Sequence, residues 1–465
     1  MRPLSQFVFE TYALSLPRGF AFGRKPPIGA WESDDSISCG IIRCDDETKM
    51  FEVIILRRRV DNVWTAIPLK KHSLKSKKSA IDFMFPFLKA GIPKEPIPPG
   101  EAHRPALWAI SPKNQPSNIF NLFLRPSHQM AGWLLNQVYL AMPNPDKNWA
   151  SDCQTKNFHT RLWEAYLLAC FREQGLLVTQ EFDSPDFHIS NQGGDEAWVE
   201  AVTANSPNTY DHVNANPVAP PEEKRELFIG QYAVRFSKTI RSKLQKGYHH
   251  LKHVRGKSFV IALADFHAPG SMTWSREALP CYLYGFFPEV IEWGAKKIAV
   301  PNKVETLIGK DSIPAGIFMS EEYSEISAVI FSNAATIAKF NRVGISAGTK
   351  IEGLKFVRYG IFWDKTPGAL KPHNFSMDIS SSEYRSLWPQ YYEPWSAELE
   401  VFHNPLAKYP LKNSFLPEAN HWRWSDGEGY CDSYYDTFIL SSKTLILKST
   451  DPTPAVEDFI NPKSL

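Results

Sequence analysis

Residues 182–205, FDSPDFHISNQGGDEAWVEAVTAN, contain two short apolar-rich runs around a Gly-Gly turn. Runs of this kind on either side of glycines predict a β-hairpin. Each run carries one acid, Asp186 in the first and Glu200 in the second. If the hairpin folds about Gly193, the two acids lie opposite each other, because each is seven positions from that glycine. Directly opposed residues of antiparallel strands share one face, with β-carbons about 5 Å apart.

Two carboxylates at this separation repel each other, and their ionised forms are stable only when a cation lies between them. A divalent metal resolves this conflict, and the hard oxygen ligands suit magnesium or manganese. A third acid, Glu164, falls at the edge of the apolar stripe of a helix that we expect at 157–175. It could complete the metal site or bind a metal-bound water.

The segments around the hairpin predict a definite order of elements. In the 157–175 stretch, apolar residues recur every four positions, which indicates a helix that ends at Gly175. LLVTQEF follows as a strand, then the two hairpin strands, then a long helix at about 223–252. KSFVIALADFH (257–267) is a strongly apolar strand. The predicted order is therefore helix, three strands, helix and strand.

This order, with its acids, resembles the PD-(D/E)XK nuclease superfamily over about residues 155–270. That superfamily has an α-β-β-β-α-β core with an acid on the first helix, Pro-Asp at the second strand and acid-x-Lys on the third. The matching residues here are Glu164, Pro185-Asp186 and Glu200. The lysine of the third motif is missing, because Glu200 is followed by Ala201-Val202. The runs EAVTAN and ADFH also resemble stretches of uncharacterised bacterial proteins.

The resemblance implies where the missing lysine could come from. Some members of the superfamily carry it on the following helix, which here contains Lys243 and Lys246. These two lysines lie near one face of that helix, so one of them could reach the sheet. We prefer Lys243.

The resemblance also implies a chemistry, namely metal-dependent hydrolysis of a phosphodiester bond. Magnesium or manganese would be held by Asp186, Glu200 and the backbone carbonyl of Ala201. It would polarise the scissile phosphate and lower the pKa of the attacking water. The lysine would orient that water or offset the charge that builds on phosphorus. An endonuclease acting on DNA, with RNA as the alternative, would suit bacterial restriction or anti-phage defence.

Clustered cations are candidate phosphate contacts. The first set lies on the second helix and at its end and consists of Lys238, Arg241 and Lys252. The second set lies in SNAATIAKFNRVG (332–344) and consists of Lys339 and Arg342. The alternative for the first set is a solvated basic face. The alternative for the second is an ordinary basic helix capped by Ser332 or Asn333.

Structural roles are open for the other candidates. Asp186 could simply begin a strand or make a turn, Glu164 could be a solvated helix residue, and Glu200 could form a structural salt bridge. A structural role is the default for Asp265 and His267 at the end of a strand. The spacing of His249 and His253 invites a zinc site, but no acid-bearing zinc motif surrounds them. Further buried strands are expected at 281–287 and 326–333.

Length and composition set the frame for these motifs. The chain of 465 residues has a formal net charge of +2, so any basic surface is local. Six scattered cysteines indicate neither a disulfide framework nor a zinc knuckle. With no signal peptide and no run long enough to span a bilayer, we expect a cytoplasmic protein without membrane contact. We divide it into a β-rich module (1–110), a connecting segment (111–150), the nuclease-like α/β domain with a mixed sheet (151–345) and an irregular β-rich module (346–465).

Two other functions compete with the nuclease. The same fold without the acid-x-Lys lysine could be a catalytically inactive nucleic-acid-binding or scaffold protein. Alternatively, the 14 Trp and 17 Tyr residues could serve recognition of proteins, peptides or sugars. A symmetric dimer is the commonest assembly, so a second copy of the chain or a partner defence protein is a further expected contact.

Overall fold

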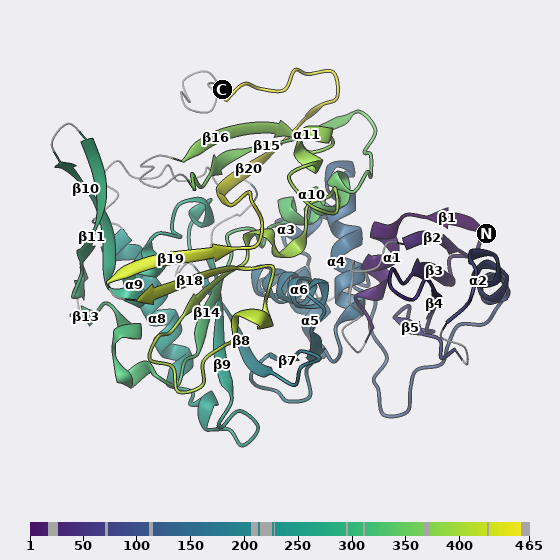
Figure 1. The fold of residues 1–465 in the computed structure, drawn as a ribbon, viewed down its shortest axis with the longest axis horizontal. Coiled ribbons are helices and arrows are strands. Elements are labelled where there is room, and N and C mark those ends of the chain that lie inside the picture. The colour runs from purple at the N-terminus through teal and green to yellow at the C-terminus, as the bar shows by residue number, and fades with distance from the viewer. Residues whose placement is uncertain are drawn as a thin grey trace.

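The structure is a computed structural model. It describes residues 1–16, 27–69, 73–110, 115–205, 213, 226, 228–293, 296–309, 312–365, 372–425 and 427–456. A central mixed sheet forms the body of this α/β protein, and a smaller sheet near the N-terminus lies at one end of it (Figure 1).

The central sheet has eight strands in the order β19-β18-β17-β14-β9-β8-β7-β6. β6, β7 and β8 are antiparallel neighbours, whereas β8, β9 and β14 are parallel. β17 is antiparallel to β14 and parallel to β18, and β19 closes the far edge as an antiparallel strand. The strands are β6 (Leu177–Thr179), β7 (Phe187–Ser190), β8 (Glu196–Asn205), β9 (Ser258–Phe266), β14 (Ala328–Phe331), β17 (Glu400–His403), β18 (Asn420–Ser425) and β19 (Glu428–Ser433).

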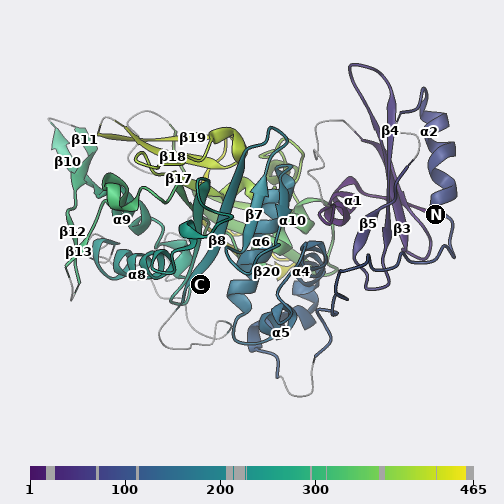
Figure 2. The ribbon, with the colours of Figure 1, turned by 90° about the horizontal axis from the view of Figure 1, so that it is seen from below.

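Helices cover both faces of this sheet around β8. Val199 and Ala201 join the core cluster that contains the buried side chains of α6 (Phe158–Glu173). Trp198 and Val202 point to the other face and join the cluster of α8 (Ala233–Leu244). Figure 2 shows the two helices on opposite sides of β8. Because both faces are buried, β8 and β9 are almost continuously apolar.

The order helix, three strands, helix and strand is confirmed as α6, β6, β7, β8, α8 and β9. The hairpin register is confirmed as well, since Phe187 pairs with Val199 and Ser190 with Glu196. The second helix is shorter than predicted. α8 follows a π-helical turn at Phe228–Tyr232 and ends before a 3-10 turn at Tyr248–His250. The start of the predicted range lies largely outside the described residues.

The N-terminal sheet has five antiparallel strands in sequence order and confirms the β-rich character of this region. They are β1 (Arg2–Leu4), β2 (Pro27–Glu32), β3 (Ser38–Cys44), β4 (Phe51–Arg58) and β5 (Trp64–Ala66). Two helices pack on it, α1 (Gln6–Ala13) and α2 (Lys77–Met84). α2 ends at Met84, where a 3-10 turn at Phe85–Leu88 follows, because Pro86 has no N–H to continue the α-helical ladder.

The described part of the predicted connecting segment 111–150 contains helices, and Leu134 and Val138 of the longest one share a core with α6. One prediction about local structure is wrong. The predicted strand at 281–287 is instead a helix up to Tyr284, which ends because Gly285 adopts a left-handed conformation (φ 76°). Short apolar runs do not distinguish buried strands from buried helices. The helices are α3 (Asn118–Asn121), α4 (Gln129–Ala141), α5 (Trp149–Gln154) and α9 (Ala278–Tyr284).

The predicted boundary between 345 and 346 does not separate two bodies, because β17, β18 and β19 complete the central sheet. The predicted strand at 326–333 is confirmed as β14. The remaining C-terminal strands form a sheet in the order β16-β15-β20, with β10-β11 and β12-β13 as separate hairpins. The elements are β10 (Phe286–Trp293), β11 (Lys296–Lys303), β12 (Thr306–Leu307), β13 (Ile313–Pro314), α10 (Ile337–Ser346), β15 (Leu354–Phe362), β16 (His373–Asp378), α11 (Ser382–Arg385) and β20 (Ile439–Lys448).

Candidate active site

Asp186 lies at the point where β7 begins, and its carboxylate faces the neighbouring strand. Its Oδ2 accepts a hydrogen bond of 2.7 Å from the backbone N–H of Ala201. The backbone pairing of β7 with β8 ends next to this residue. The carboxylate of Asp186 therefore accepts the N–H of β8 in place of a backbone carbonyl. This bond fixes the carboxylate beside Glu200, the residue opposite it when the register is continued by one step.

Glu200 is 4 % exposed and lies on the face of β8 that α8 covers. Lys243 of α8 reaches it, with 2.6 Å between Nζ and Oε1. Burial alone lowers the pKa of a lysine, but the hydrogen bond and charge of Glu200 raise the pKa of Lys243 above its ordinary value. The lysine is thus held in its charged form against the buried carboxylate.

The field around Asp186 is strongly negative. Burial raises its pKa well above the ordinary value, and the charges of Glu200 and Glu164 raise it further. The Ala201 N–H and Lys243 act in the opposite direction and do not cancel the rise. Both Glu200 on the neighbouring strand and Glu164 on α6 therefore act on Asp186.

Glu164 is buried on α6 rather than solvated. It accepts hydrogen bonds from Nε1 of Trp149 (2.7 Å) and from Nη1 of Arg161 (3.0 Å). Arg161 also pairs with Asp152 at 2.6 Å, so it links Glu164 to the edge of α5. Burial raises the pKa of Glu164, which these two donors partly offset.

The structure distinguishes between the two candidate lysines. Lys246 is exposed, and its Nζ lies 5.7 Å from the ring centroid of Tyr248 rather than beside a carboxylate. Lys243 is the lysine at the site. The backbone carbonyl of Ala201 stays a predicted metal ligand, while its N–H has a role that the sequence did not reveal.

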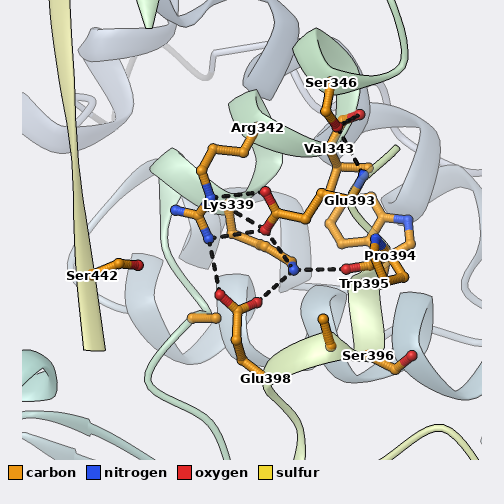
Figure 3. A network of polar contacts seen from close by, with 12 residues as sticks. Lys339, Arg342, Val343, Ser346, Glu393, Pro394, Trp395, Ser396, Glu398 and Ser442 are labelled. Carbon is orange, nitrogen blue, oxygen red and sulfur yellow. Dashed lines mark hydrogen bonds and ion pairs between the residues drawn. The ribbon is translucent and has the colours of Figure 1, made fainter. Parts of the chain in front are cut away.

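The predicted phosphate contacts divide into two groups. Lys238, Arg241 and Lys252 are exposed on α8 and in the segment after it. Lys339 and Arg342 of α10 are instead almost fully buried, so the prediction that they contact nucleic acid is corrected. The Nζ of Lys339 lies 2.8 Å from Glu393 and 2.7 Å from Glu398, as Figure 3 shows.

The cap of α10 also differs from the prediction. The side chain of Thr336, rather than that of Ser332 or Asn333, caps the helix and accepts a hydrogen bond from the backbone N–H of Lys339. Lys339, in the first turn of the helix, pairs with acids from a segment more than fifty residues away.

Other candidates have structural partners. Nδ1 of His267 lies 2.5 Å from Asp265, whose second oxygen accepts a hydrogen bond from Ser275. His253 contacts the carbonyl of Ser184 at 2.9 Å, whereas the ring of His249 lies against that of His250. Within the described ranges, no group of three or more His, Cys, Asp or Glu side chains is arranged to hold a metal, and the six cysteines are free thiols.

Sequence reasoning missed Trp149 and Arg161. Arg161 precedes Glu164 by three positions, and this spacing on a helix was a usable signal for an ion pair. Trp149 was hidden because its segment looked like a connection. Its indole N–H reaches Glu164 only because α5 packs against α6.

No family model, curated protein or solved structure compared with this chain matches it significantly. In the part of the chain that the structure describes, no helix has the length and apolar character to cross a membrane.

Proposed function

We propose that this protein is a metal-dependent nuclease that hydrolyses phosphodiester bonds of DNA, built on a PD-(D/E)XK-like core. One observation carries the proposal: Asp186 and Glu200 are held side by side, with Lys243 on the second, inside the order α6, β6, β7, β8, α8 and β9. A structural ion pair would need one acid and one base. Here a second acid, Asp186, lies beside Glu200 although burial, and then the charge of Glu200, raise its pKa.

The donor set fits a hard divalent cation. Asp186 and Glu200 supply carboxylate oxygens, and the strain between their charges is relieved when a dication is shared. Asp186, Glu200 and the Ala201 carbonyl would hold magnesium or manganese. When bound, this ion would polarise the scissile phosphate and lower the pKa of a water molecule.

The residues of the chain have separate tasks in this reaction. The Ala201 N–H orients Asp186, so that one carboxylate oxygen is fixed and the other is left for binding. Lys243 is the charged donor nearest to the acids, and its Nζ would orient the attacking water or offset charge on the phosphate. Glu164, held by Trp149 and Arg161, adds negative charge behind Asp186 and favours a cation in front of it.

The exposed cations Lys238, Arg241 and Lys252 would attract the phosphates that flank the cleaved bond. The N-terminal sheet and the C-terminal strands would select the substrate or a partner, as a restriction or defence nuclease requires. Two copies acting together would cut both strands of a duplex.

A cleavage assay tests the proposal. Plasmid and oligonucleotide DNA, with an RNA oligonucleotide in parallel, are incubated with the purified protein and magnesium, manganese or EDTA. We expect metal-dependent cleavage that Asp186→Ala and Glu200→Ala each abolish. The matched control is Asp195→Asn, which changes a turn acid paired with Lys412 and should leave cleavage unchanged. Full activity of either alanine variant would contradict the site.

The second candidate is a nucleic-acid-binding protein without catalysis. One observation favours it: Lys243 already neutralises Glu200, and Val202 stands where the superfamily pattern has its lysine. Such a protein would bind DNA with strong salt dependence and would cleave nothing with either metal. The same assay, combined with a binding titration at two salt concentrations, separates the two functions.

A further inference from the structure

Four aromatic rings form a row of contacts, the stack, beside the two acids, in which the planes of His253 and Trp198 are inclined by 57°. The rings of Phe182 and His253 lie face to face, with centroids 3.9 Å apart and planes inclined by 8°. The ring of Trp198 lies 4.6 Å from that of His253, and His188 stacks on Trp198 at 4.4 Å. The stack joins three segments: the loop before β7, the hairpin strands and the segment after α8.

The stack is connected directly to the candidate site. His253 holds the carbonyl of Ser184, two residues before Asp186, at 2.9 Å. Trp198 precedes Glu200 by two positions and so lies on the same face of β8. A ligand bound at the outer end of the stack would therefore lie near Asp186 and Glu200.

Phe182 is the outer end of the stack. It is 46 % exposed, whereas Trp198 is 4 % exposed. Phe182 belongs to none of the hydrophobic core clusters that the described residues form. An apolar ring that is supported from behind and open to solvent in front is the arrangement on which nucleic-acid-binding proteins stack bases.

The charges nearby are mixed: Glu181 and Asp183 flank Phe182 and Glu196 pairs with Lys257, but exposed lysines also lie beside the rings. Lys252 is exposed next to His253, and Nζ of Lys257 lies 5.9 Å from the ring centroid of Trp198. Lys246 is exposed at the end of α8. Cations around an aromatic platform indicate a strand whose phosphates follow the lysines while its bases meet the ring.

We propose that Phe182 stacks an unpaired base of the substrate, so that the protein acts on DNA with a single-stranded stretch at the cleavage point. The proposal rests on the nuclease function and names its substrate class. A base inside a duplex is already stacked on both sides, so the ring can receive only a base from a single strand, a flap or an opened end.

Binding in the absence of metal tests this inference. A fluorescein-labelled 20-nucleotide single strand and the blunt duplex of the same sequence are titrated with protein in EDTA, which excludes cleavage. We expect Phe182→Ala to weaken single-strand binding about 5- to 100-fold, the range that one base–aromatic stack contributes. Duplex binding should change less than about twofold. Phe182→Trp should restore single-strand affinity because it restores the ring.

Phe85→Ala is the matched control, since Phe85 is 37 % exposed in the N-terminal region, away from the acids. Equal losses for both DNA forms, no loss for Phe182→Ala, or no single-strand binding by the unaltered protein would each overturn the inference. Failure of the nuclease proposal looks different: single-strand binding would depend on Phe182, but magnesium or manganese would yield no cleavage.

Discussion

At the scale of residues, Glu200 shows how a charge is kept inside this protein. A carboxylate that is 4 % exposed is stable only with a partner, and Lys243 provides it at 2.6 Å from the neighbouring helix. Among the residues that the structure describes, no cation is paired with Asp186, whose carboxylate accepts the Ala201 N–H. The pair of acids is therefore only half compensated, which is why we assign them a role in binding a cation.

Replacing Lys243 measures what this partner contributes. Lys243→Met leaves Glu200 buried without its cation, and we expect the free energy of unfolding to fall by about 1–3 kcal/mol. Lys246→Met removes an exposed lysine three positions away and should change it by less than about 0.5 kcal/mol. Urea denaturation of the metal-free proteins gives both values. Equal stability of the two variants would show that the Lys243–Glu200 contact does not hold in solution.

The acids could be predicted from the sequence because strand geometry is regular. A turn centre at Gly193 and a side-chain period of two were enough to place Asp186 opposite Glu200. The burial of Lys339 could not be predicted. Its partners Glu393 and Glu398 are distant in sequence, and a basic helix looks the same whether water or a buried acid lies beside it.

At the scale of elements, α10 is held to the C-terminal strands by buried charges. Lys339 and Arg342 of the helix and Arg358 of β15 share the carboxylates of Glu393 and Glu398, all of them nearly inaccessible to water (Figure 3). Three cations and two acids leave one uncompensated positive charge. Burial is the main cause that lowers the pKa of Lys339 to about 8, and the charges of Arg342 and Arg358 lower it further against the effect of Glu393.

This charge count predicts a ranking of two substitutions in the network. Glu398→Gln leaves three cations with one acid and should lower the free energy of unfolding by about 3–5 kcal/mol. Lys339→Met leaves two cations with two acids and should cost clearly less, although it removes more hydrogen bonds. Urea denaturation at pH 7 gives the ranking. If Lys339→Met proves the more damaging change, hydrogen bonds rather than charge balance govern this part of the protein.

The elements that sequence reasoning misread have a common physical cause. The helices α4 and α9 consist of short apolar stretches that are buried on most sides, so neither shows a polar face that would reveal a helical period. α6 and α8 were easier to predict. α8 keeps part of its surface in water, whereas α6 is buried throughout Leu162–Arg172 and was recognised from apolar residues that recur every four positions.

At the scale of the whole molecule, the central sheet is completed by strands that lie far apart in the sequence. β14 pairs with β9 on one side and with β17 on the other. β17 lies more than fifty residues beyond the boundary that we predicted from composition. The change in composition after residue 345, from which we predicted an irregular β-rich module, coincides with the excursion through β15 and β16 before the chain returns to the central sheet.

A fragment of residues 151–345 should therefore not fold alone. It would expose the buried edge of β14 and the apolar side chains that pack on β17. An exposed strand edge of this kind pairs with strands of other chains, which leads to aggregation. We expect an aggregated fragment without cooperative thermal unfolding. A fragment of residues 115–465 keeps all eight strands and should yield soluble, cooperatively unfolding protein. Cooperative unfolding of 151–345 would instead establish the nuclease-like core as an independent domain.

The N-terminal helix, the end of α6 and the C-terminal segment meet at a cavity of about 400 Å³ that contains the carboxylates of Glu10, Glu173 and Glu418. The oxygens of Glu173 accept the N–H groups of Trp395 and Ser396. Burial, and then the charge of Glu418, raise the pKa of Glu173 from its ordinary value of 4.5 to about 7. The folded protein therefore holds this proton more tightly than the unfolded chain does.

The contribution of Glu173 is accordingly complete below about pH 4.5 and is lost as the pH rises through about 7. Between pH 5 and pH 8 the free energy of unfolding should fall by on the order of 2 kcal/mol more in the unaltered protein than in Glu173→Gln, which has no proton to lose. Glu428→Gln, at an exposed position, controls for the change in net charge and should follow the unaltered protein. Urea denaturation at four pH values gives the difference. Parallel pH profiles for Glu173→Gln and the unaltered protein would mean that Glu173 is ionised throughout, and that the three segments meet more loosely than the structure indicates.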